Sequence, residues 1–470
     1  MSRYAPLVRR ALLLSGCAIA VSGVRGNAQE RPTSRESDRR ASQFEMPDTA
    51  QFRMFLQNRL VAFVVPDPRV PVVSFTAMIR GGTATDEDAG AAEMLALMLA
   101  TRGPCWMAPG TFRQTLEDTA AEFRVHMTPE MTQIRLSVAA DNALDGLRVF
   151  SGIVRETCID EQGLATFRAE VARHAQDADV TDSATATFEG GMATAVSLFN
   201  QVLYGDHPYA RHVTEEEARH LEVDHVEDFH DEVFVPANLT LAVSGDFDLE
   251  RMAQAVDQRF ADWEDRRPPF LRSAPQVDAP NTRRLHFFPV EEERAWVVVG
   301  HELPEIEARD LPAMQVMNYI VGNAHSDTGP VETMDESAIA NSASGYIELN
   351  MRGPGTYTFR TSSRPEVLGQ SIDVLFQEIE RVRTETVSAE ELRVAKAAFT
   401  DGAFPMRFEN GHATALTFAE EWTRYASLEN LAQYRDRIES VSARDVQRAA
   451  QRYLNPQRMQ VVVLAPQRPS

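Results

Sequence analysis

The chain has 470 residues, of which 43% are hydrophobic and 25% are charged, and this composition is typical of a globular protein with substantial cores. The 69 acidic residues outnumber the 47 basic ones, which gives a formal net charge of −22 at pH 7. A surface this acidic disfavours nucleic acid and anionic lipid as partners.

Residues 1–28 have the pattern of an export signal. Basic residues precede a short apolar run, and a Gly-Asn-Ala sequence that ends at Ala28 suits a signal peptidase. Cys17 lies in a Leu-Ser-Gly-Cys sequence that resembles a bacterial lipobox, so cleavage after Ala28 and lipidation at Cys17 both remain open. We expect an exported protein, periplasmic or secreted, whose only route to a membrane is a lipid on Cys17. One disulfide between Cys105 and Cys158 is compatible with an oxidising compartment, but their spacing does not predict it.

Composition divides the rest of the chain into two halves. Residues 29–49 are polar and aperiodic, which predicts a flexible leader. Residues 266–282 are rich in proline, which fixes φ and removes hydrogen-bond donors, and they predict a linker. The predicted domains are therefore residues 50–265 and residues 283–470.

Each half opens with two strand-like runs and continues with long amphipathic stretches. The predicted strands cover residues 60–65, 72–79, 285–290 and 295–300. The predicted helices cover residues 111–121, 141–156, 161–176, 184–203, 366–383, 389–404 and 412–426. Strands and helices that mix without strict alternation predict an α+β fold with a mostly antiparallel sheet in each half.

The two halves end in the same pattern. Each has a helix, a turn marked by proline and then a strand of buried character. Pro236 aligns with Pro456, and Val226 with Val446, at one constant offset. A constant offset over about twenty residues favours a duplication, so we expect two homologous domains.

Five short segments occur in an order and spacing that resemble one known family. They are the Arg-Gly-Gly of residues 80–82, the apolar helix of residues 90–99, Asp-His-Pro-Tyr-Ala-Arg at residues 206–211, the strand of residues 234–248, and Arg-Gly-Pro-Gly at residues 352–355. Together they resemble the insulinase-like (pitrilysin-type) zinc metallopeptidases over nearly all of both halves. The resemblance implies two homologous α+β domains joined by a linker.

The resemblance also places the family's zinc motif, His-x-x-Glu-His, on a helix of this chain. Its first histidine corresponds to Glu93, its catalytic glutamate to Ala96 and its second histidine to Leu97. In an intact motif, the two imidazoles share one helical face and hold the zinc while the glutamate polarises the bound water. This chain has neither imidazole nor the base, so we expect no zinc cofactor and no peptidase activity from the chain by itself.

Two further sets of family residues were located by counting along the chain. The third zinc ligand falls at Glu170, with His174 one turn further on, so a substitute metal site made of Glu93, Glu170 and His174 stays open beside the commoner interpretation of a surface Glu–His pair. In two-subunit members, the zinc-free chain supplies an Arg and a Tyr. Their positions here are Asp335 and Ser342, so this pair is also expected to be lost.

One binding element is expected to survive. Family members bind peptide by adding it to an edge strand of the first sheet, and that place corresponds to Phe123, Arg124, Val125, His126 and Met127. Such pairing uses main-chain groups, so it does not depend on the metal. The alternative is an ordinary core strand.

The sequence therefore predicts a catalytically inactive insulinase-like protein. The resemblance implies a partner subunit for a zinc-bearing homologue, the two chains enclosing a clamshell chamber in which peptides are degraded. Two alternatives stay open, a peptide-binding or scaffold protein of the cell envelope without a peptidase partner, and a hydrolase with an atypical metal site.

Overall fold

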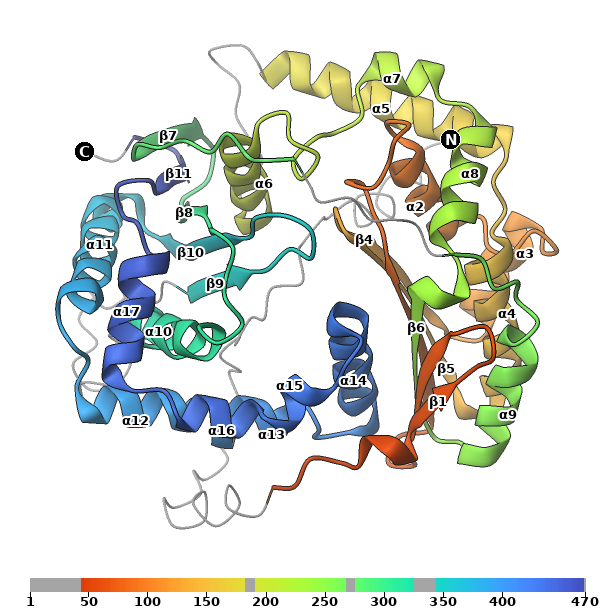
Figure 1. The fold of residues 1–470 in the computed structure, drawn as a ribbon. Coiled ribbons are helices and arrows are strands. Elements are labelled where there is room, and N and C mark those ends of the chain that lie inside the picture. The colour runs from red at the N-terminus through yellow and green to blue at the C-terminus, as the bar shows by residue number, and fades with distance from the viewer. Residues whose placement is uncertain (1–43, 182–190, 268–274, 324–343, 469–470) are drawn as a thin grey trace.

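The computed structural model describes residues 44–181, 191–267, 275–323 and 344–468, and of residues 109, 174–181 and 323 it describes only the backbone. These residues form two halves, each a sheet packed with helices (Figure 1). The predicted α+β fold with two mostly antiparallel sheets is confirmed. Across the described residues, no helix combines the length and the apolar sequence that crossing a membrane requires.

The first sheet has the strand order β1-β2-β6-β3-β5-β4. Only β2 and β6 run parallel, and the other neighbours are antiparallel. The strands are β1 (Arg53–Phe55), β2 (Val61–Pro66), β3 (Val72–Arg80), β4 (Glu122–Met127), β5 (Met131–Ala139) and β6 (Leu239–Gly245).

Within the described residues, the second sheet repeats this topology without a counterpart of β1. Its order is β7-β11-β8-β10-β9, with β7 and β11 parallel, as β2 and β6 are in the first sheet. The strands are β7 (Arg284–Pro289), β8 (Ala295–Glu302), β9 (Ser344–Glu348), β10 (Thr356–Ser363) and β11 (Gln460–Ala465). The shared order, with one parallel pair in the same place, agrees with the predicted duplication.

Helices make up the remaining layers. In the first half they are α2 (Ala91–Thr101), α3 (Pro109–Asp118), α4 (Ala143–Glu156), α5 (Glu161–Thr181), α6 (Met192–Tyr204), α7 (Glu215–His220), α8 (Val223–Val233) and α9 (Leu249–Phe260). In the second half they are α10 (Leu311–Asn323), α11 (Leu368–Thr384), α12 (Ala389–Ala397), α13 (Phe404–Met406), α14 (Gly411–Tyr425), α15 (Glu429–Ala432), α16 (Tyr434–Glu439) and α17 (Ala443–Tyr453).

The predicted helix over residues 389–404 is interrupted. After α12, the backbone makes a π-helical turn, η8 (Ala398–Ala403), and α13 then follows. A π-helical turn inserts a residue into the regular hydrogen-bond ladder. The apolar spacing of the sequence does not reveal that insertion.

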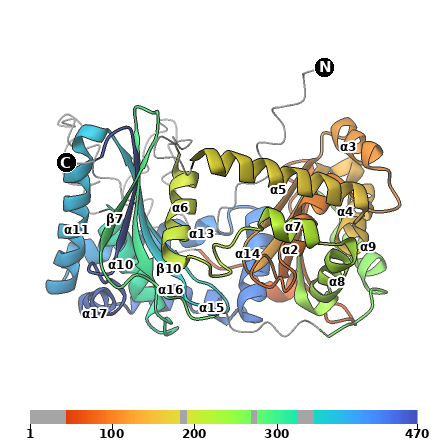
Figure 2. The ribbon, with the colours of Figure 1, turned by 90° about the horizontal axis from the view of Figure 1, so that it is seen from above.

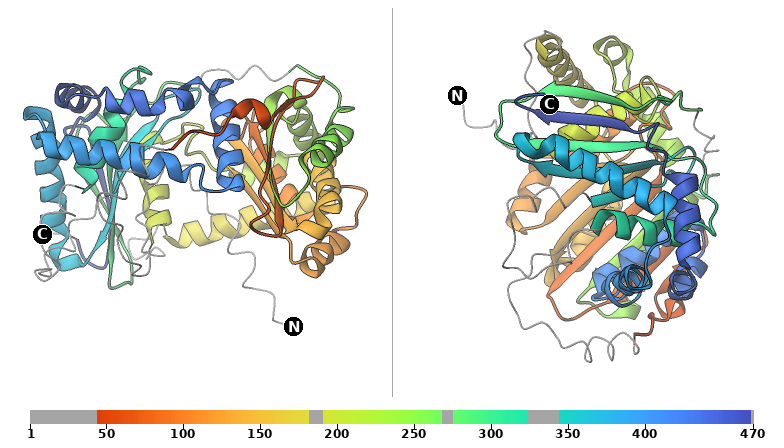
Figure 3. Two further views of the ribbon diagram at one scale, coloured as in Figure 1. Left: turned by 90° about the horizontal axis from the view of Figure 1, so that it is seen from below. Right: turned by 90° about the vertical axis from the view of Figure 1, so that its left-hand side faces the viewer.

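Each sheet is covered on one face by a helix from the other half (Figures 1 and 3). Helix α14 lies on β2, β3 and β6, and helix α6 lies on β8 and β11. Alternate residues of the buried strands therefore face different layers. On β2, Ala62 and Val64 face the helices of their own half, whereas Val61, Phe63 and Val65 face α14. Burial on both faces explains why β2 is continuously apolar rather than alternating, and β6 is likewise buried at every position.

We call α6 and α14 the exchanged helices, because each covers the sheet of the other half. Large side chains fill the interface of each exchanged helix with that sheet. The ring centroids of Phe63 and Phe418 lie 5.6 Å apart, and neither side chain is exposed to solvent. In the other half, Phe199 of α6 packs against Val298 and Val462. Because each interface joins the two halves, separating them would expose both cores to water.

Parts of the predicted leader and linker also pack. The ring of Phe44 lies 5.8 Å from that of Phe404 and 5.7 Å from that of Phe408. Within the predicted linker, the carbonyl of Pro275 lies 3.0 Å from Nε2 of His207. Residues 1–43 and 268–274, which include the predicted signal and Cys17, lie outside the described residues.

We expect Phe418→Ala to destabilise both halves together. Removing this buried ring leaves a cavity against Phe63, which costs about 3–5 kcal/mol. Urea denaturation followed by fluorescence should show a lower midpoint, whereas Leu144→Ala, a truncation on the exposed face of α4, should leave the midpoint nearly unchanged. A midpoint for Phe418→Ala equal to that of the unmodified protein would contradict the proposed role of the exchanged helix.

Candidate functional site

Helix α2 presents two different faces. Met94, Leu95, Met98 and Leu99 are buried in the core of the first half. Glu93, Ala96 and Leu97, the positions that correspond to the zinc motif, are half-buried and share the opposite face, because residues three and four apart lie on one side of a helix. The structure thus brings these three predicted positions together, but they include one carboxylate and two side chains without donor atoms, which does not fit zinc.

Glu93 has protein partners in place of a metal. Its carboxylate accepts a hydrogen bond from the backbone N–H of Val213, and the Arg211 guanidinium lies close enough to favour the ionised form. Burial outweighs both effects and raises the pKa of Glu93 to about 7. The chain around Val213 approaches α2 closely, since a side chain at Gly90, where φ is +99°, would collide with Val213. Glu93 therefore holds this segment against the start of α2.

The start of α2 is fixed by a second buried carboxylate. Asp86 Oδ2 accepts hydrogen bonds from the N–H groups of Gly90 and Ala92, each at 3.0 Å. Burial raises the pKa of Asp86 to about 6, and these N–H groups act in the opposite direction. The acidic loop before α2 is thus a helix cap, and its sequence alone did not show that role.

The other predicted metal ligands do not complete a site. Glu170 is half-buried on α5, and the side chain of His174 lies outside the described part of the structure. Among the side chains that are described, no three His, Cys, Asp or Glu residues gather closely enough to hold a metal ion. Asp335 and Ser342, at the positions of the assisting Arg and Tyr, also lie outside the described residues.

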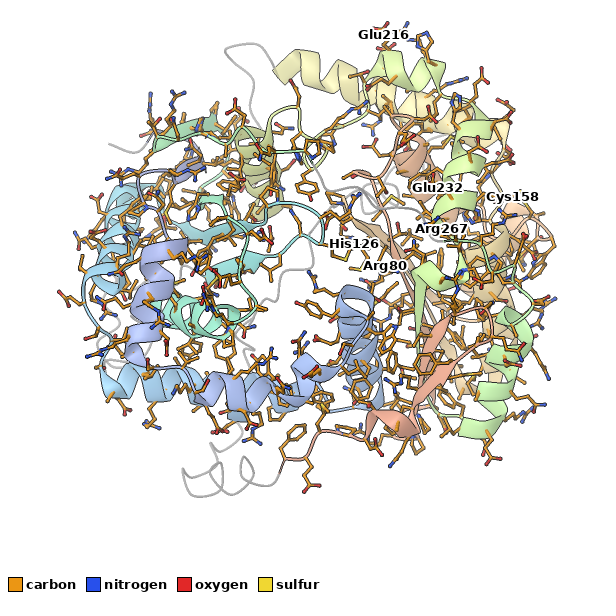
Figure 4. The ribbon with its side chains drawn as sticks, viewed as in Figure 1. Arg80, His126, Cys158, Glu216, Glu232 and Arg267 are labelled. Atoms are coloured by element: carbon orange, nitrogen blue, oxygen red, sulfur yellow. The ribbon has the colours of Figure 1, made fainter. Side chains whose placement is uncertain are left out.

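The strand expected to bind peptide is β4, and it is the outer strand of the first sheet. Within the described residues, β4 pairs only with β5. Phe123, Val125 and Met127 pack into the core, so Arg124 and His126 lie on the opposite side of the strand. Figure 4 places His126 where the first half faces the second. The geometry that edge pairing needs is present.

A cavity of about 1710 Å³ lies between the two halves. The first half contributes Glu93, Met127 and residues of α6, and the second half contributes the Arg-Gly-Pro-Gly turn and residues of η8 and α14. This volume exceeds that of a usual small-molecule pocket and is compatible with an extended peptide.

A buried ion pair closes one side of this cavity. Glu130, in the turn after β4, accepts hydrogen bonds from the Tyr209 hydroxyl at 2.6 Å, from the Arg352 N–H at 3.0 Å and from the Met351 N–H. The Arg352 guanidinium pairs with the same carboxylate at 3.5 Å, and both side chains are at least nine-tenths buried. Burial and the Glu130 hydrogen bond raise the pKa of Tyr209 above its usual range. No role for Glu130 follows from the sequence alone, because its partners come from distant segments.

We expect Glu93 to make stability depend on pH. Burial raises the pKa of Glu93 in the folded protein above its value of 4.5 in the unfolded chain. The unfolding free energy is therefore highest below pH 4.5, where the carboxyl is protonated in both states, and it falls as pH rises through about 7. Between pH 5 and pH 8, the unmodified protein should lose about 2–3 kcal/mol more unfolding free energy than Glu93→Gln does. Urea unfolding at the two pH values measures this difference. Glu216→Gln, at an exposed site, is the control, and equal pH dependence of Glu93→Gln and the unmodified protein would refute the assignment.

Comparison with known proteins agrees with the resemblance to the insulinase-like family. The family described as the peptidase M16 inactive domain matches residues 220–399. The zinc protease PqqE of Helicobacter pylori is 20% identical over 250 residues, which cover 51% of this chain and 54% of that protein. The chain thus spans about half the length of this curated relative.

Two solved structures share the fold at 16% sequence identity. A peptidase M16 inactive domain from Pseudomonas fluorescens gives a TM-score of 0.68, with 88% of this chain and 98% of that chain covered. A putative M16-like peptidase from Alicyclobacillus acidocaldarius gives 0.72, with 90% and 99% covered. The family match over residues 220–399, the sequence similarity and the shared fold support an inactive insulinase-like (M16) protein. The assignment of Glu93, Ala96 and Leu97 to the positions of the zinc motif rests on the sequence resemblance.

Proposed function

We propose that this inactive insulinase-like protein is the non-catalytic partner of a zinc-bearing homologue, and that the two chains together enclose a chamber for peptide degradation. One observation carries the proposal. Helix α2 keeps its buried residues Met94, Leu95, Met98 and Leu99, whereas its cavity face has no zinc-binding group beyond Glu93. The fold has been maintained while the chemistry has been lost, which suits a chain that is retained for its shape and its surface.

The cavity and the edge strand supply what a partner subunit needs. The cavity can hold a peptide segment, and β4 can pair with that segment through main-chain groups. Neither function requires a metal. In this proposal the chain positions peptide, the homologue supplies the zinc, and both act outside the cytoplasm, in keeping with the predicted signal at residues 1–28.

A scaffold role without a peptidase partner is the second candidate. The contacts between the two halves favour a scaffold role. The exchanged helices and the buried Glu130–Arg352 ion pair hold the cavity walls in one arrangement. A fixed shape suits a structural component as well as a peptidase subunit. Co-purification of a zinc-bearing homologue from the host distinguishes the two functions.

A hydrolase with an atypical metal site is the third candidate, and it would need Glu93, Glu170 and His174 to act as ligands. The Glu93 carboxylate already accepts the Val213 N–H, which counts against a ligand role.

The purified protein should contain no stoichiometric zinc. A structural or catalytic zinc needs at least three protein ligands, and α2 offers one carboxylate. Elemental analysis of the full-length protein after dialysis against trace zinc measures the content, with an intact insulinase-like peptidase as the positive control. One tightly held zinc per chain that disappears in Glu170→Ala or His174→Ala would support the atypical hydrolase instead.

Mixing the protein with a zinc-bearing homologue from the same host should raise the homologue's hydrolysis of a fluorogenic peptide. The reason is that the second chain completes the chamber wall and adds the β4 edge. A variant of β4 with Val125→Pro, which removes one main-chain donor, should raise the hydrolysis less. Val125→Ala, which keeps the main-chain N–H at the same position, is the matched control for the lost side chain. A homologue that is fully active alone and does not associate with this chain would exclude the partner role and leave the scaffold role.

A further inference from the structure

The two cysteines of the first half lie side by side at a junction of helices. Pro104 and Thr157 form an isolated antiparallel bridge. It is closed by hydrogen bonds from the Cys105 N–H to the Glu156 carbonyl at 2.9 Å and from the Cys158 N–H to the Gly103 carbonyl at 3.0 Å. Each cysteine is one residue beyond the bridged pair. In this antiparallel register Cys105 lies opposite Glu156 and Cys158 lies opposite Gly103, so the two cysteines are diagonal neighbours on one face of the bridge.

The thiols also interact with each other. The Cys105 thiol lies 3.7 Å from the Thr157 carbonyl oxygen, next to Cys158 in the chain. Burial, followed by a hydrogen bond with the Cys158 thiol, raises the pKa of Cys105 to about 12. Both cysteines are in the free form in the structure, with Cys105 exposed and Cys158 partly buried. An oxidant can therefore reach the pair from solvent.

We propose that Cys105 and Cys158 form a structural disulfide in the exported protein. Sγ of each thiol loses its proton, one S–S bond forms, and the two electrons reduce the disulfide of a thiol–disulfide oxidant to two thiols. The surroundings of Cys105 do not stabilise a thiolate, and a dithiol without thiolate stabilisation favours the oxidised state.

The proposed bond would link helix α2 to helix α5. Cys105 follows the end of α2 by four residues, and Cys158 precedes the start of α5 by three. These helices carry Glu93 and Glu170, the positions at which a zinc ion would have joined them. The bond would tie the end of α2 to the start of α5, on the outer side of the first half, where Figure 4 shows Cys158. This comparison with a lost metal rests on the proposed function, whereas the bond itself does not.

The junction is already built as a contact between α2 and α5. Arg102, which caps α2, pairs with Asp160, and Asp160 Oδ1 accepts the N–H of Gly163 at 2.7 Å at the start of α5. Gly163 lies so close to Met98 that a side chain there would collide with it. From this junction α5 runs along the molecule toward α6 (Figure 2). A disulfide at this junction would fix the N-terminal end of helix α5.

Thiol alkylation tests the bond. The full-length protein is incubated with oxidised glutathione, denatured and alkylated before or after reduction, and its peptides are analysed by mass spectrometry. We expect Cys105 and Cys158 to be protected before reduction and to appear in one linked peptide, whereas Cys105→Ser and Cys158→Ser should each lose that peptide and expose one thiol. Full alkylation of both thiols before reduction would overturn the proposal, and so would linkage only between different chains.

The same preparations test what the bond holds. Reducing the unmodified protein should lower its thermal midpoint by roughly 4 °C, because the bond closes a long loop in a large chain. Amide hydrogen exchange in α2 and in the first turns of α5 should become faster. The Cys105→Ser, Cys158→Ser double variant controls for the reductant and should show neither change. If the bond forms but reduction alters neither quantity, it does not fix the helices. Both measurements use the protein alone, so a failure to bind a homologue would not affect them.

Discussion

The exchange of α6 and α14 is the constraint on which the rest of the structure depends. Each sheet needs its second face covered, and each receives that cover from the other half. Because the two helices cover buried apolar side chains of the opposite half, neither half can leave the other without exposing side chains such as Phe63 and Phe199 to water. The walls of the central cavity are therefore fixed by the same interfaces that stabilise the fold.

Stability and chemistry are separated on helix α2. The residues that anchor the helix point into the core, and Glu93, on the opposite face, lines the cavity. Under the proposed function, the zinc-binding residues were lost while the core residues kept the helix in place. Glu93 shows how such a position is reused, because its carboxylate now holds the segment at Val213 and acquires a raised pKa through burial.

The sequence predicted the local structure well where one periodicity dominates. The strands β2 and β3 and the helices α4 and α11 lie within a few residues of their predicted ranges, since burial imposes a clear apolar pattern on each. The sequence could not show which sheet α14 covers, because an apolar face does not identify its partner. It also did not reveal the role of Glu130, whose partners Tyr209 and Arg352 are distant in sequence. The three positions of the zinc motif were found by resemblance alone.

Native mass measurement of the protein isolated from its own host, with metal analysis of the same sample, tests the central claim most directly. The proposed function predicts a complex of this chain with a second chain of the same family, and one zinc per complex that stays with the second chain after separation. A chain that is isolated alone, or only with copies of itself, and that carries its own tightly bound zinc would contradict the claim.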